Sequence, residues 1–74
     1  MSDDIGEALA VLRAADQQVA AAMQDNQQAE KTFLRERTVE AQRRLVRSTR
    51  ALEAAGQRLE AAHAALEKLI EENQ

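Results

Sequence analysis

The two halves of this 74-residue chain match each other in reverse order, and this match constrains the fold more than any other feature. When residue i is set against residue 74 − i, bulky apolar side chains face small ones along nearly the whole chain. The layers are Ile5–Leu69, Ala8–Leu66, Leu12–Ala62, Ala15–Leu59, Val19–Ala55, Ala22–Leu52, Asn26–Ser48, Ala29–Leu45 and Phe33–Ala41. The pattern predicts two antiparallel helical segments that share one closely packed seam.

The bulky seam residues recur every seven residues within each half of the chain. The large apolar members of this seam are Ile5, Leu12, Val19, Phe33, Leu45, Leu52, Leu59, Leu66 and Leu69. A strict seven-residue repeat predicts that the helices wind around each other in a left-handed supercoil. Phe33 and Leu45 are twelve residues apart, which is no whole number of heptads. The chain is therefore expected to change direction between them.

The composition supports an all-α fold with a single domain over residues 1–74. The chain has no proline, two glycines and one aromatic residue, Phe33. Alanine, leucine, glutamate, glutamine and arginine dominate, and all of them favour helices. A chain of this length leaves no room for a second domain.

The expected helix boundaries follow from capping residues. Ser2 or Asp3 is suited to cap a first helix over about residues 3–35, because short polar side chains accept hydrogen bonds from free backbone N–H groups. Thr38 is suited to cap a second helix over about residues 39–72, after a turn at about 36–39. No glycine, proline or asparagine marks this turn. An alternative is one continuous helix, ~105 Å long, that pairs with a second copy in an antiparallel dimer.

The charge distribution favours the hairpin over the continuous helix. Residues 1–30 carry a net charge of −5, residues 31–50 carry +5 and residues 51–74 carry −3. A dimer of long helices would bring two basic centres together, and like charges at close range repel each other. In a hairpin the basic segment forms the tip and the acidic segments form the open end. Two hairpins laid tip to tail then match opposite charges.

A second apolar face is expected beside the seam. An isolated two-helix hairpin with an alanine-rich seam buries little apolar surface and is marginally stable. One flank of the hairpin is less charged than the other, and its candidate interface residues are Leu9, Met23, Gly56, His63 and Ile70. Glycine inside a helix costs about 1 kcal/mol relative to alanine, so Gly56 either allows a close approach of a partner backbone or is merely tolerated. We expect this flank to pack against a second copy in a dimeric four-helix bundle.

Arginine side chains concentrate around the expected turn. The cluster consists of Arg35, Arg37, Arg43, Arg44, Arg47 and Arg50. Guanidinium groups bind phosphates and carboxylates, so the cluster suits nucleic acid, an acidic protein surface or the acidic end of a neighbouring subunit. Glu36 and Glu40 interrupt the cluster, and the one aromatic residue, Phe33, belongs to the seam, which leaves none to stack on bases. A protein partner is therefore expected before nucleic acid.

The sequence offers no candidate catalytic, cofactor-binding or metal-binding site. His63 is the only histidine, and the chain contains no cysteine and no glycine-rich phosphate loop. Metal sites in proteins need several convergent donors, so His63 is expected to be a packing residue. We expect no enzyme activity, no cofactor and no small-molecule substrate. There is no apolar run of ~18 residues for a membrane span and no secretory signal, so a cytoplasmic location is expected.

Three functional classes are compatible with these observations. The first is a small adaptor or assembly protein, with a regulatory role, that self-associates and binds a protein partner. The second is a nucleic-acid-binding helical hairpin that uses the arginine-rich tip. The third is a structural coiled-coil segment of a larger filament or virion assembly. The bias towards alanine and arginine suggests a GC-rich bacterial or phage genome as the source.

Overall fold

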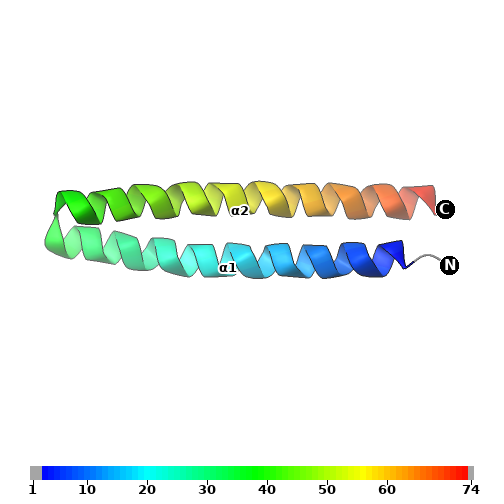
Figure 1. Cartoon of the computed structure of the whole chain (residues 1–74), viewed down its shortest axis with the longest axis horizontal. Helices are drawn as coiled ribbons and strands as arrows, with labels where there is room; N and C mark the ends of the chain where they lie inside the picture. The colour runs from blue at the N-terminus through cyan, green and yellow to red at the C-terminus, as the bar shows by residue number, and fades with distance from the viewer. Residues whose placement is uncertain (1–2, 74) are drawn as a thin grey trace.

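The computed structural model describes residues 3–73, which form two long antiparallel helices joined by a short turn (Figure 1). Helix α1 spans Asp4–Glu36 and helix α2 spans Val39–Glu72. The hairpin measures 55 × 13 × 12 Å along its principal axes. The all-α hairpin expected from the sequence is confirmed, and the chain folds back on itself instead of continuing as one helix.

The turn consists of Arg37 and Thr38, and its geometry explains how it forms without glycine. Arg37 adopts the left-handed conformation, with φ 53° and ψ 37°. Its backbone N–H donates to the carbonyl of Phe33 at 2.8 Å, and its Nε donates to the carbonyl of Leu34 at 3.4 Å. These bonds satisfy carbonyls that the end of a helix leaves free. Arg37 therefore takes the role that glycine usually has at a helix C-terminus.

Thr38 begins the second helix as its N-cap. Its Oγ1 accepts a hydrogen bond from the backbone N–H of Ala41 at 3.0 Å, which is the geometry expected of a threonine cap. At the start of α1 the situation differs. Asp3 occupies the cap position, but its side chain makes no capping hydrogen bond. The other candidate cap, Ser2, lies outside the described residues.

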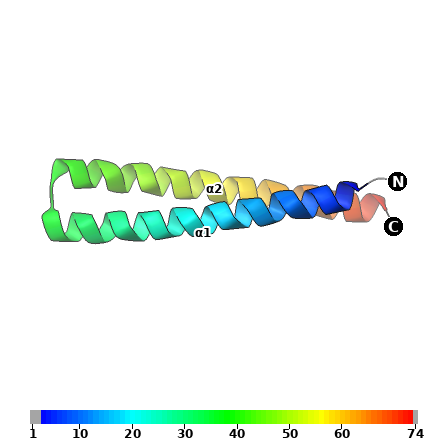
Figure 2. The ribbon, with the colours of Figure 1, turned by 60° about the horizontal axis from the view of Figure 1, so that its bottom comes forward.

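The small seam residues form the buried core. Among residues 3–73 the buried positions are Ala15, Ala29, Ala41, Ser48, Ala55 and Ala62. The large seam residues from Leu12 to Leu69 are half-buried, and Ile5 near the open end is exposed. A bulky side chain on a two-helix seam covers the alanine opposite, while its own outer side still meets solvent. In the turned view α1 crosses α2 towards the open end, as expected for helices that wind around each other (Figure 2).

A polar layer lies in the half of the seam nearer the turn. Asn26 Nδ2 donates to Ser48 Oγ and to Thr49 Oγ1, each at 3.0 Å. Ser48 Oγ in turn donates to the carbonyl of Leu45 at 2.9 Å. A shift in the pairing of the two helices would separate these groups. The layer therefore favours one register of the hairpin, as buried polar residues do in coiled coils.

Candidate interaction surfaces

Exposed large apolar side chains concentrate on the flank that the sequence analysis selected. Met23 is 47% exposed and Ile70 is 41% exposed, and Leu9 is also exposed. Three further exposed residues, Leu34, Val39 and Val46, occupy the next line outward on the same side of their helices, by their positions in the heptad repeat. We refer to this side of the hairpin as the apolar flank. Its larger side chains are Leu9, Met23, Leu34, Val39, Val46 and Ile70.

Gly56 and His63 lie on the apolar flank between the larger side chains. A Cβ atom placed on Gly56 would meet no heavy atom within 4 Å. The neighbouring helix of the same chain therefore gives no steric reason for glycine here. His63 is exposed and borders a hollow of about 240 Å³ with Leu12, Arg13, Asp16 and Leu59. Both positions are accessible to a partner.

The arginine cluster is brought to the tip of the hairpin by the turn. Among residues 3–73 only Arg44 of these six arginines forms an ion pair, with Asp25 at 3.5 Å. Arg37 is partly engaged by the carbonyl of Leu34. Arg43, Arg47 and Arg50 border a hollow of about 260 Å³ together with Gln42 and Val46. The tip therefore combines cationic groups with the exposed apolar side chains of Leu34, Val39 and Val46.

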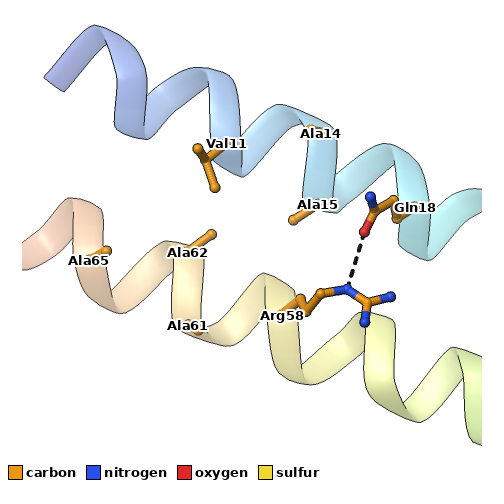
Figure 3. Close-up of a pocket in the computed structure, with 8 residues that line it drawn as sticks. All are labelled: Val11, Ala14, Ala15, Gln18, Arg58, Ala61, Ala62 and Ala65. Carbon is orange, nitrogen blue, oxygen red and sulfur yellow. Dashed lines mark hydrogen bonds between the residues drawn. The ribbon is translucent and has the colours of Figure 1, made fainter. Parts of the chain in front are cut away.

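A groove on the opposite flank was not anticipated from the sequence. It encloses about 450 Å³, and the residues that line it are Val11, Ala14, Ala15, Gln18, Arg58, Ala61, Ala62 and Ala65 (Figure 3). Arg58 Nε donates to Gln18 Oε1 at 3.2 Å and bridges the two helices at one end of the groove (Figure 3). The sequence signal that could have predicted this groove is the presence of alanines beside the seam, at Ala14, Ala61 and Ala65. We call this feature the alanine groove.

The described part of the chain contains no cluster suited to hold a metal ion. Across residues 3–73 no group of three or more histidine, cysteine, aspartate or glutamate residues converges. Neither α1 nor α2 contains an apolar stretch long enough to cross a membrane. The features that remain are surfaces suited to contact other molecules: the apolar flank, the basic tip and the alanine groove.

Comparison with protein-family models, with curated proteins and with solved structures found no match for this chain.

Proposed function

We propose that this chain is a small non-enzymatic adaptor or assembly protein. In this proposal it self-associates through the apolar flank into a four-helix bundle and binds a protein partner through a remaining helical face. The single observation that carries the proposal is an apolar flank that runs along both helices and has no cover within the hairpin.

The amount of exposed surface supports self-association. The hairpin exposes 5775 Å², whereas a compact monomer of 8.2 kDa exposes about 4,500 Å². Among residues 3–73 no large side chain is fully buried. Small domains with so little core are usually stabilised by disulfides, metals or oligomerisation. A second copy would bury the apolar flank that the single hairpin leaves in water.

The alanine groove supports the binding of a partner protein. It lies on the flank opposite the self-association face, so it stays accessible when two hairpins pair. Small side chains along its floor let the backbone of another helix approach closely, and Val11 provides an apolar rim. We therefore propose an amphipathic helix of a second protein as the ligand of this groove.

Sedimentation of a double variant tests self-association. We expect Met23→Glu with Ile70→Glu to convert the oligomer into a folded but less stable monomer, because four carboxylates would meet in the dimer interface. The matched control is Val11→Glu with Ala21→Glu, which adds the same charge on the opposite flank and should leave the oligomer intact. A double variant at Met23 and Ile70 that still sediments as the wild-type oligomer would disprove this face.

Co-purification tests the partner site. The wild-type chain and an Ala61→Phe variant, in which the new ring fills the alanine groove, would be purified from the native host and compared by mass spectrometry. We expect a protein that stays bound to the wild type after nuclease treatment and is lost from the variant. A protein retained equally by both chains would show that the groove is not its site.

A nucleic-acid-binding hairpin is the second candidate function, and the basic tip favours it. Arg43, Arg47 and Arg50 make no ion pair in residues 3–73, so they remain available to phosphates. Several phosphate contacts would make the affinity for unspecific RNA or DNA fall steeply with added salt. Weak binding without this salt dependence would exclude nucleic-acid binding as the function.

The third candidate function, a structural segment of a larger filament or virion assembly, predicts open-ended polymers. The proposed four-helix bundle is instead a closed oligomer.

A further inference from the structure

The two ends of the hairpin carry opposite charge, and this polarity specifies how a second copy would bind. The turn places Arg43, Arg47 and Arg50 in the half of the 55 Å hairpin that contains the tip. The start of α1 and the end of α2 lie together at the other end (Figure 1), where Asp4, Glu67 and other acidic residues are found. Pairing the hairpins with both tips on the same side would bring like charges together, which costs free energy. Opposite orientation brings unlike charges together.

We propose that the occupant of the apolar flank is a second copy of this chain in tip-to-tail orientation, related by a twofold axis across the middle of the hairpin. This inference rests on the proposed self-association and adds its orientation and register. In this arrangement α1 lies on α1 of the second copy and α2 lies on α2 of the second copy. Every neighbouring pair of helices is then antiparallel, which also aligns the helix dipoles favourably.

The order of side chains along α1 fits this arrangement. If Leu9 is set against Leu34 of the second copy, the two exposed leucines cover each other. The same alignment sets Arg13 against Glu30 of the second copy. At the centre it sets Ala20 against Met23 of the second copy, a small side chain against a large one. The self-pairing of α1 thus repeats the size complementarity found in the seam of the hairpin.

The order of side chains along α2 fits an axis about two residues, or ~3 Å, from the one that α1 indicates. Antiparallel alignment near the middle of α2 sets Val39 against Ile70 of the second copy. It also brings Arg43 towards Glu67 of the second copy and Arg50 towards Glu60 of the second copy. The twofold axis repeats each contact, so the two pairings on α2 and the Arg13–Glu30 pairing on α1 give six opposite-charge pairs in the interface. Near the axis, Gly56 has no Cβ to hold the two α2 helices apart.

The size of the face is sufficient for a stable dimer. A face 55 Å long and 13 Å wide covers about 700 Å² per copy, close to the ~800 Å² per partner of a standard specific interface. A central methionine with a polar rim follows the usual anatomy of such interfaces.

Engineered disulfides test the orientation, because the natural chain has no cysteine. Leu9→Cys and Leu34→Cys variants would be made separately, mixed and oxidised. The proposal expects cross-linked dimers mainly between the two different variants, since disulfides need Cα atoms within about 7 Å. Each variant alone should cross-link poorly, because its two cysteines would lie at opposite ends. Efficient cross-linking of either variant with itself would overturn the tip-to-tail orientation.

Charge exchange tests the rim pairs. Arg43→Glu with Arg50→Glu should raise the dimer dissociation constant on the order of tenfold, since exposed pairs contribute modestly. Adding Glu60→Arg and Glu67→Arg to the same chain should restore the wild-type constant. No restoration, in a chain that still dimerises, would overturn the inference and leave self-association standing. A chain that stays monomeric at all concentrations would overturn both the proposed self-association and its tip-to-tail orientation.

Discussion

At the scale of single residues, the turn depends on one strained arginine. Arg37 has a positive φ of 53°, a conformation that costs a residue with a Cβ about 1–2 kcal/mol. A β-branched residue tolerates this region less well than arginine. We predict that Arg37→Val lowers the free energy of unfolding by about 1 kcal/mol, measured by denaturant titration of the circular dichroism signal.

The matched control at this position is Arg37→Gly, because glycine adopts a positive φ without steric cost. Glycine also gains entropy in the unfolded chain and loses the bond to Leu34, so the net gain should be small. A valine variant as stable as the glycine variant would contradict the strained conformation.

Gly56 provides a second prediction at the scale of a residue. A Cβ on Gly56 meets nothing within 4 Å, so Gly56→Ala should stabilise the single hairpin by about 1 kcal/mol through helix propensity. The same methyl group lies near the proposed twofold axis and should weaken the dimer. Denaturation at low protein concentration measures the first effect, and sedimentation measures the second.

Ala51→Gly is the control for this prediction, because residue 51 is exposed in α2 and lies on the flank opposite the apolar flank. It should lower hairpin stability by about 1 kcal/mol without changing the dimer interface. An unchanged dimer affinity for Gly56→Ala would mean that glycine at this position is merely tolerated.

At the scale of the helices, the pairing depends on a large residue opposite a small one. Ala29 is 0% exposed and belongs to the same layer as Leu45. We predict that Ala29→Leu destabilises the hairpin by about 1–3 kcal/mol, because two leucines overfill the layer. Leu45→Ala should cost about 2 kcal/mol or more, because it leaves the layer underfilled.

The double variant Ala29→Leu with Leu45→Ala restores one large and one small residue. It should therefore recover most of the lost stability, with a coupling energy of about 1–3 kcal/mol in a double-mutant cycle. Ala64→Leu on the exposed face is the control and should be nearly neutral. Additive losses from the two single changes would show that this layer does not pair as described.

At the scale of the whole molecule, stability should depend on protein concentration. Binding of a second copy stabilises a fold by about 2.7 kcal/mol at a hundredfold excess over the dissociation constant. For a chain of this size 1 kcal/mol shifts the melting temperature by about 4–8 °C. We therefore predict a rise on the order of 10 °C between dilute and concentrated samples, measured by circular dichroism.

Added salt should reduce this concentration dependence, because it screens the charges at the rim. The variant with Met23→Glu and Ile70→Glu should melt at a temperature independent of concentration. A wild-type chain that also melts independently of concentration would contradict self-association.

The sequence by itself determined the helical class, the antiparallel pairing and the residues at which a turn would fall if the chain folded back. Layers such as Ala29–Leu45 can be read without coordinates because helix packing is periodic and a large side chain needs a small neighbour. Thr38 was also identifiable, because threonine as an N-cap is a local preference. The side on which Leu9, Met23 and Ile70 lie followed from the same heptad count.

Only the tertiary structure decided that the chain folds back as a hairpin, how it turns and which surfaces it leaves open. A left-handed Arg37 could not be expected from its residue type, because its conformation is stabilised by carbonyls of Phe33 and Leu34 that the fold brings within reach. The alanine groove likewise depends on two helices that are distant in sequence. A groove is a property of the space between helices, so the periodicity within one helix cannot predict it.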